Sequence, residues 1–428
     1  MPLRLDASSP DFAGAFTALV EARREADADV SRDVAAIVAR VRAEGDAALA
    51  ELTQRFDAHD LDAGGWEVPR AERRAALDAL DPGLRDALEL AGDRIRAYHA
   101  SQRPANRDET DAAGIRLGAR WNAVEAAGLY VPGGRAAYPS TVLMNAIPAK
   151  MAGVERLAMV TPTPGGETNA LVLAAAEIAG VDEVWRIGGA QAIAALAYGT
   201  RRIGRVDVVV GPGNAWVAEA KRQLYGVVGI DMVAGPSEIV VVADAANDPA
   251  WIAADLLSQA EHDPTSQSIL FTDDAAFADA VATGVEQQLA TLPTGKVSRE
   301  AWEANGAIVV VPALDAALPL VDRLAPEHLE LAVDDPDALF ARVRHAGSVF
   351  LGRHTPEAIG DYVAGPNHVL PTGRRARFAS GLSVLDFMKR TSFIACSPQG
   401  LGAIGPAAIA LAQAEGLPAH AASIRVRL

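Results

Sequence analysis

Cysteine is almost absent from this chain of 428 residues, in which Cys396 stands alone. A single cysteine excludes an intrachain disulfide framework and any zinc site built from several thiolates. Cys396 could still be a nucleophile, but it lies in the apolar run 392–397, which predicts a strand and a small core residue. Long apolar runs are missing too, since no stretch reaches the roughly 18 apolar residues of a membrane-spanning helix. Residues 1–6 contain no basic segment followed by an apolar run, so we expect a cytoplasmic protein without a membrane partner.

Positive charge is scarce as well, because 39 Lys and Arg stand against 55 Asp and Glu, for a net charge of −16. Nucleic-acid binding through clustered cations is therefore not expected. An anionic cofactor would need backbone N–H groups and helix N-termini instead. Apolar residues make up 50% of the chain, which is enough for more than one core, and the length predicts about three domains.

Periodicity divides the chain into a helical beginning and a longer alternating part. Residues 12–24, 30–56 and 70–102 carry apolar residues at spacings of three and four, which predicts helices. From Val124 on, short apolar runs bounded by Gly and Pro alternate with helical stretches, which predicts βαβ units and parallel sheets. The expected strands are 125–131, 156–161, 183–187, 206–210, 238–243, 268–272, 307–311, 329–333 and 348–351.

The expected strands fall into two groups. The first four have the spacing of a nucleotide-binding half, and the later ones are expected in a second sheet. Residues 235–238 mark a hinge between them, in which Ser237 either caps a turn or faces the cleft. A helix over 405–415 and a strand over 423–428 end the chain. This tail is too short to bury a core alone, so we expect it to dock on something larger.

Three glycine-rich turns follow expected strands, at residues 130–134, 188–191 and 211–214. Each alone is typical of a plain tight loop, whereas three at the carboxyl ends of one sheet favour a ligand crevice. None is a complete G-x-G-x-x-G motif, since Trp216 stands where the last glycine would be. Lys221 lies too far beyond the last turn for a Walker loop, so ATP chemistry is not indicated.

Four residues in the second half of the chain could meet in one metal site. Gln259 and His262 are three apart on an expected helix, so their side chains lie over the same face. An ordinary polar helix end is the alternative, because such pairs are common. Asp361 and His420 lie far downstream, as ligands do in a site assembled by folding. Together the four offer nitrogen and oxygen donors that suit zinc.

Glu327 and His328 stand together just before an expected strand. A carboxylate and an imidazole near one substrate can divide two proton transfers between them. We interpret the other histidines as structural: His59 and His99 on helix surfaces or linkers, His345 and His354 on the surface, and His368 fixing a loop.

Eight stretches carry these residues, and together they closely resemble the L-histidinol dehydrogenase family. They cover the chain from about residue 120 to its end, while the helical beginning is consistent with the family in length. Any one glycine turn is unspecific, but the whole set is specific. The stretches are 188–197, 211–214, 234–238, 255–262, 325–329, 360–362, 387–390 and 415–420.

The resemblance implies a role for each matching residue. The zinc ligands would be Gln259, His262, Asp361 and His420, and the acid/base pair would be Glu327 and His328. The NAD contacts would be Tyr130, Gln191 and Asn214. The substrate contacts would be Ser237 and Glu415 together with His328 and the four ligands.

The implied reaction is the four-electron oxidation of L-histidinol to L-histidine through L-histidinal, the last step of histidine biosynthesis. It uses two NAD in turn and one zinc ion per subunit of a homodimer with shared active sites. Two alternatives stay open: a dehydrogenase of the same fold acting on another small polar alcohol, and a zinc hydrolase with Glu327 as its base.

The implied fold is α/β, with two incomplete Rossmann-like parallel-sheet domains related to those of aldehyde dehydrogenases. The family lacks the cysteine nucleophile of those enzymes, which agrees with the setting of Cys396. The expected parts are a helical extension over 1–27, a zinc and substrate domain over 28–129 and 238–382, an NAD domain over 130–237, and a dimerisation tail over 383–428.

Overall fold

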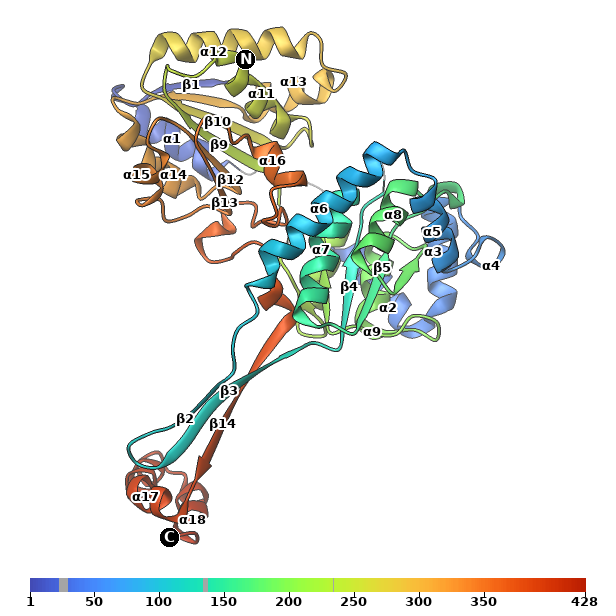
Figure 1. The fold of residues 1–428 in the computed structure, drawn as a ribbon, viewed down its shortest axis with the longest axis vertical. Coiled ribbons are helices and arrows are strands. Elements are labelled where there is room, and N and C mark those ends of the chain that lie inside the picture. The colour runs from blue at the N-terminus through green and yellow to red at the C-terminus, as the bar shows by residue number, and fades with distance from the viewer. Residues whose placement is uncertain (23–29, 134–137, 234) are drawn as a thin grey trace.

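The computed structural model describes residues 1–22, 30–133, 138–233 and 235–428. The described chain forms two parallel sheets, each covered by helices, and a separate antiparallel arm (Figure 1). The α/β prediction with two parallel sheets is confirmed. No helix in the described ranges is long and apolar enough to cross a membrane.

The first sheet has five parallel strands in the order β6-β5-β4-β7-β8. If these five strands are renumbered from 1 to 5 in chain order, the order across the sheet is 3-2-1-4-5. The strand order therefore reverses between β4 and β7, and ligands of such sheets usually bind at the carboxyl ends beside this point. Helices α7 to α10 connect the strands. The bounds are β4 Ala126–Tyr130, α7 Pro139–Ala152, β5 Arg156–Val160, α8 Ala170–Ala179, β6 Glu183–Trp185, α9 Gly189–Tyr198, β7 Val208–Val210, α10 Ala215–Leu224 and β8 Gly229–Ile230.

The second sheet has six parallel strands in the order β1-β11-β10-β9-β12-β13. One of its two central strands, β9, is entirely buried, and it pairs with β12 so that His328 stands opposite Ile239. The bounds are β1 Leu3–Asp6, β9 Glu238–Ala243, α11 Pro249–Ala260, β10 Gln267–Thr272, α12 Ala275–Leu289, α13 Gly295–Asn305, β11 Ala307–Val310, α14 Leu318–Leu324, β12 His328–Ala332, α15 Pro336–Phe340, β13 Ser348–Leu351 and α16 Glu357–Tyr362.

The helices at the start of the chain pack mainly on the first sheet: α2 contacts α9, α5 contacts α8, and α6 contacts α7. The predicted continuous helix over 30–56 is broken at Gly45, whose φ of +56° favours glycine. The predicted helix over 70–102 is broken before Asp81 and Pro82, which start a new helix. The bounds are α1 Phe12–Glu21, α2 Ser31–Glu44, α3 Asp46–Asp57, α4 Leu61–Gly64, α5 Arg70–Asp78 and α6 Pro82–Ala100.

This packing favours a different grouping from the predicted domain boundaries, which stay a prediction. Helices α2 to α6 were assigned to the zinc and substrate domain, yet they lie against the first sheet. Strand β1 pairs with β11, so the first residues join the second sheet instead of forming a separate extension. The positions of α2 to α6 and of β1 both depend on tertiary contacts, which leave no local pattern in the sequence.

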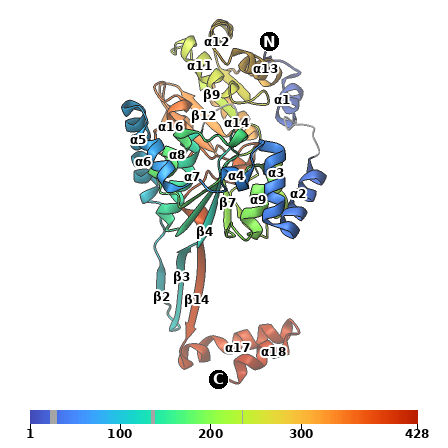
Figure 2. The same cartoon turned by 90° about the vertical axis from the view of Figure 1, so that its right-hand side faces the viewer.

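A three-stranded antiparallel arm leaves the body and carries two helices at its tip (Figures 1 and 2). The predicted strand over 423–428 is wrong, because Pro418 and the alanines that follow it start a helix there. Cys396 ends β14 but is exposed, so the prediction of a core residue is also wrong. The bounds are β2 Arg107–Thr110, β3 Ile115–Ala123, β14 Met388–Cys396, α17 Pro398–Ala414 and α18 Pro418–Arg425.

One further correction concerns a histidine. His99 of α6 has an exposed fraction of 0% and does not lie on the helix surface. His59 lies in the linker between α3 and α4, which was one of the two predicted places, and is buried with an exposed fraction of 5%. His99 Nδ1 lies 2.7 Å from Gln102 Oε1, which gives the buried ring a partner. Short 3₁₀ turns complete the chain: η1 Pro164–Gly166, η2 Leu314–Ala317, η3 Arg375–Arg377 and η4 Val384–Phe387.

The core of the second sheet yields a matched test of stability. Phe271 of β10 is fully buried against Phe16, with ring centroids 6.3 Å apart, whereas Phe378 is 81% exposed. Phe271→Ala should lower the free energy of unfolding by about 3–5 kcal/mol, because it leaves a cavity. Phe378→Ala should change it by less than about 0.5 kcal/mol. Urea denaturation of both variants checks this, and equal losses would contradict the assigned core.

Candidate functional site

The candidate site lies at the amino ends of β9, β12 and β13. Glu327 immediately precedes β12 and His328 is its first residue, and both side chains are buried. The backbone of Glu238, the first residue of β9, holds both of them. Its N–H donates to Glu327 Oε2 at 3.0 Å, and its carbonyl oxygen lies 3.1 Å from His328 Nδ1.

This contact decides which nitrogen of His328 can act as a base. A carbonyl oxygen only accepts hydrogen bonds, so Nδ1 must carry the proton and Nε2 must carry the lone pair. Nε2 is buried and has no hydrogen-bond partner among the described residues. Burial lowers the pKa of His328 from its ordinary value, which keeps the ring neutral, although Glu357 opposes the shift.

Two carboxylates of α16 face His328 Nε2. Glu357 Oε1 lies 3.6 Å away and Asp361 Oδ1 lies 4.0 Å away. One ligand atom from each of the three residues can be chosen so that all lie within 4.8 Å of one another. Glu357 and Asp361 are four apart, so one helical face presents both. The sequence analysis missed Glu357, although this spacing could have found it.

The predicted pair on α11 is also brought together. Gln259 is fully buried, and its Nε2 lies 3.5 Å from Nδ1 of His262, which follows the helix end. Gln259 Oε1 has no hydrogen-bond partner among the described residues. Ser258 donates to Glu357 Oε2 at 3.1 Å and so joins α11 to α16. The site therefore gathers nitrogen and oxygen donors without sulfur, which suits a borderline divalent ion such as zinc.

Buried carboxyl groups gather around His328. Burial raises the pKa of Glu327 well above its usual range, and Glu238, Asp361 and Glu357 add to the shift. Burial also raises the pKa of Asp361 to about 8, again with help from Glu357. Buried carboxylates without a cation take up protons instead of staying charged.

A small pocket of about 140 Å³ lies against His328, Asp361 and His368. His368 Nδ1 lies 3.0 Å from the carbonyl oxygen of Asp361 and its Nε2 lies 3.5 Å from Thr141 Oγ1 at the start of α7. The histidine thus joins its loop to α16, as predicted. Because α7 follows β4, this contact also brings the amino ends of the second sheet close to the carboxyl ends of the first.

The predicted dinucleotide contacts lie at the carboxyl ends of the first sheet. Tyr130 ends β4, and its hydroxyl accepts a hydrogen bond from Gly189 N at 3.1 Å. Burial raises the pKa of Tyr130 to about 12, so its hydroxyl keeps its proton. Gln191 is buried in the first turn of α9, and Asn214 caps α10 by accepting from Trp216 N and Val217 N.

Two predicted residues are not brought to the site within one chain. Glu415 follows α17 and His420 lies in α18, and both are exposed at the tip of the arm (Figure 2). Helices α11 and α16, which carry the other candidate ligands, lie at the opposite end of the molecule (Figure 1). Ser237 directly precedes β9 and is next to Glu238, whose backbone contacts Glu327 and His328.

The family model described as histidinol dehydrogenase matches residues 20–428. The chain belongs to the histidinol dehydrogenase family. It is 67% identical to the histidinol dehydrogenase of Zymomonas mobilis, with 100% of both chains covered. It is 62% identical to that of Rhodospirillum rubrum, over 100% of this chain and 99% of the other. The crystal structure of histidinol dehydrogenase from Elizabethkingia anophelis superposes with a TM-score of 0.94 at 34% identity, over 100% of this chain and 98% of that one.

A further pair of carboxyl groups joins α11 to β12, two elements that carry residues of the candidate site. Asp255 of α11 and Glu330 of β12 share a hydrogen bond between their side chains. Burial raises the pKa of Glu330 to about 9, and the charges of Asp255 and Glu357 contribute. Burial likewise raises the pKa of Asp255 to about 6.

The metal-free protein should therefore lose stability as the pH rises. Between these pH values the folded state keeps a proton on Glu330 that the unfolded chain releases. The contribution of Glu330 to the free energy of unfolding is therefore complete below about pH 4.5 and is lost as the pH rises toward about 9. Glu330→Gln should flatten that slope, because the neutral amide has no proton to lose. Denaturant midpoints measured across this range check the sign, and an unchanged slope would argue against the shared proton.

Proposed function

We propose that this chain is a cytoplasmic, zinc-dependent and NAD-dependent histidinol dehydrogenase. It oxidises L-histidinol to L-histidine through L-histidinal, in the last step of histidine biosynthesis. The observation that carries the chemistry is His328, whose unprotonated Nε2 faces the pocket beside Glu357 and Asp361. Full-length identity to histidinol dehydrogenases supports the substrate.

The metal ligands in this proposal are Gln259, His262 and Asp361 of one chain and His420 of the partner subunit, for one zinc per subunit. The unpartnered oxygen of Gln259 and the excess of carboxylates fit a cation at this place. When bound, zinc would hold the imidazole and amine of histidinol, since it accepts nitrogen ligands. Ser237, His328 and Glu415 complete the substrate contacts.

His328 and Glu327 divide the proton transfers. His328 Nε2 would take the proton of the alcohol's hydroxyl group, and bound NAD would supply the acceptor for the hydride of the carbon that bears this hydroxyl, which yields the aldehyde. Glu327 would then take a proton from the water that adds to the aldehyde, and a second bound NAD would supply the hydride acceptor that turns the hydrate into the acid. A raised pKa makes Glu327 the stronger base once it has lost its proton.

The dinucleotide lies along the carboxyl ends of the first sheet in this proposal, with Tyr130, Gln191 and Asn214 as its contacts. The reversal of strand order between β4 and β7 favours that position. Tyr130 supports it as well, because its protonated hydroxyl stands beside the glycine turn at the start of α9.

The proposal includes a homodimer in which each tail completes the partner's site. Exposed apolar residues on the arm and its tip support this, since Ile394 is 71% exposed, Leu411 65% and Val426 78%. A symmetric exchange would bury them and would bring Glu415 and His420 to the other chain's site.

One assay separates this proposal from its two alternatives, a dehydrogenase that acts on another small polar alcohol and a zinc hydrolase. Histidinol and NAD should give about two NADH for each histidine formed, because two hydrides leave the substrate. Chelation should abolish the reaction and added zinc should restore it. Absorbance of NADH is the measurement. Turnover in protein shown to be metal-free would refute the zinc site, and hydrolysis without NADH would favour the hydrolase.

Mixed dimers test the shared site. His262→Ala and His420→Ala should each be inactive as homodimers. If tails are exchanged, one site of a mixed dimer carries both lesions and the other carries neither, so subunit exchange should recover up to about half of the wild-type activity per mixed dimer. Dimers of His262→Ala mixed with a second His262→Ala preparation serve as the control. No recovery after proven exchange would mean that each tail serves its own chain.

A further inference from the structure

A buried ion pair holds the glycine turn at residues 211–214. Lys221, in α10, donates from Nζ to the carbonyl oxygen of Gly211 at 2.6 Å and to Asp231 Oδ1 at 2.6 Å. Asp231 Oδ2 accepts from Gly211 N at 2.8 Å. The two charged side chains are only 3% and 1% exposed. Both backbone polar groups of Gly211 are thus bound to one lysine and one aspartate.

The backbone position of Gly211 requires glycine. Its φ is +110°, which favours glycine. A Cβ at this residue would meet the carbonyl oxygen of Tyr130 at 2.2 Å. The turn therefore packs directly on the backbone that ends β4, at the point where the strand order reverses. The ion pair, Gly211 and Tyr130 form one continuous contact beneath the proposed dinucleotide site.

The other end of the turn is fixed differently. Asn214 caps α10 through its side-chain oxygen. In the described ranges, the N–H groups of Gly213 and Asn214 donate no hydrogen bond. Two free backbone donors before a helix of this length are suited to the pyrophosphate of a dinucleotide. Their direction depends on the turn, and the turn depends on Lys221 and Asp231.

We propose that Lys221 and Asp231 are positioning residues for NAD. They hold the 211–214 turn in the conformation that presents its N–H groups and Asn214 to the dinucleotide, without touching it themselves. The inference rests on the proposed function, since it takes NAD as the ligand. A preformed turn binds more tightly because it loses less conformational entropy on binding.

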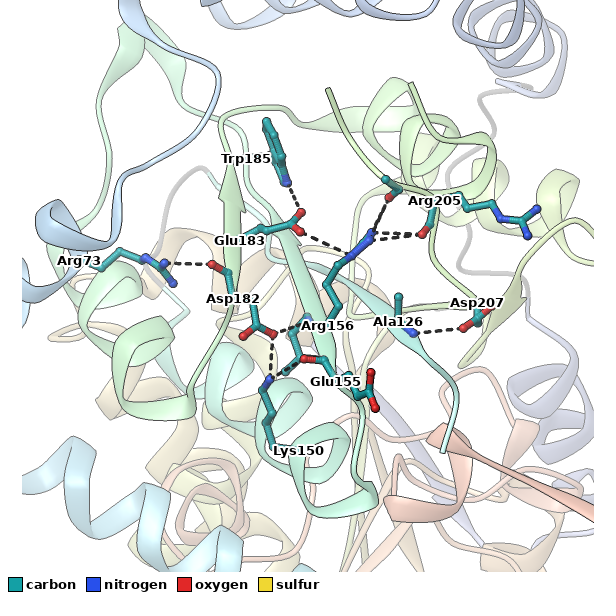
Figure 3. Close-up of polar contacts among 12 residues, drawn as sticks. Arg73, Ala126, Lys150, Glu155, Arg156, Asp182, Glu183, Trp185, Arg205 and Asp207 are labelled. Carbon is teal, nitrogen blue, oxygen red and sulfur yellow. Dashed lines mark hydrogen bonds and ion pairs between the residues drawn. The ribbon is translucent and has the colours of Figure 1, made fainter. Parts of the chain in front are cut away.

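A second lysine–aspartate ion pair lies beside the same sheet, at another of its edges (Figure 3). Lys150 donates to Asp182 Oδ2 at 2.8 Å and to the carbonyl oxygen of Glu155 at 3.4 Å. Asp182 Oδ2 also accepts from Leu157 N at 2.8 Å. This pair lies at the amino ends of β5 and β6, the edge opposite to the proposed NAD contacts. Its side chains are more exposed, at 29% and 43%, and it serves as the control for a lysine–aspartate pair away from the proposed NAD contacts.

The experiment compares Lys221→Met with Lys150→Met in the full-length, zinc-loaded protein. Lys221→Met should raise the NAD dissociation constant and the KM for NAD by at least about tenfold. It should leave kcat at saturating NAD within about twofold and the KM for histidinol unchanged. Lys150→Met should lower the melting temperature but leave both NAD constants unchanged. Titration calorimetry and steady-state kinetics are the measurements.

Asp231→Asn gives an independent arm in case Lys221→Met does not fold. Its amide keeps an oxygen for Gly211 N but sets an N–H₂ group against Lys221, so it should weaken NAD binding by a smaller factor. Equal changes in NAD affinity in Lys221→Met and Lys150→Met would overturn the inference, as would a fall in kcat alone. A wild type that binds NAD but leaves histidinol unoxidised would refute the proposed function and not this inference, whereas a wild type that binds no NAD would overturn both.

Discussion

The pairing of β9 with β12 is the constraint on which the candidate site depends. Because the two strands are parallel neighbours, the first residue of β9 lies beside the start of β12. The backbone of Glu238 can then donate to Glu327 and accept from His328. A backbone amide cannot rotate away as a side chain can, so one peptide group and its neighbour set both the carboxylate orientation and the imidazole tautomer. The pairing of β9 with β12 thus determines that Nε2 is the basic nitrogen of His328.

The second constraint is the surplus of buried carboxyl groups around that imidazole. Glu327, Asp361 and Glu330 all have raised pKa values, and burial is the largest cause for each. Clustered anions in a low dielectric are costly unless protons or a cation neutralise them. A divalent ion would replace several of those protons at once, so metal affinity and pH should be closely linked. The surplus of buried carboxyl groups is thus the feature of this chain that favours a cation in the proposed site.

Much of this architecture could be predicted from local pattern, and the failures have physical causes. Each of the nine expected strands overlaps a strand of the structure, because buried parallel strands are apolar runs bounded by turns. Strands β1, β2 and β8 were missed because they are short or exposed and take their conformation from a neighbouring strand. Strand β3 was missed although its apolar residues alternate from Ile115 to Ala123, and β14 was predicted only over its last residues, within 392–397. Gln259, His262 and Asp361 were predicted as metal ligands, and this role stays a prediction. Glu357, which lies 3.6 Å from His328 Nε2, was overlooked although it precedes Asp361 by one helical turn.

In the proposed function, the arm is the part of the chain that a partner would stabilise. Strands β3 and β14 pair over nine residues each, yet most of their residues are exposed or only partly buried. A narrow ribbon of this kind has no core of its own, and a sheet normally needs at least one covered apolar face for stability. The tip adds helices that are too short to make a second core. A surface that covers the arm would stabilise it, and the same contact would carry Glu415 and His420 to a site that lacks them. Folding of the arm and completion of the site would then be a single event, so the protein would become active only as it assembles.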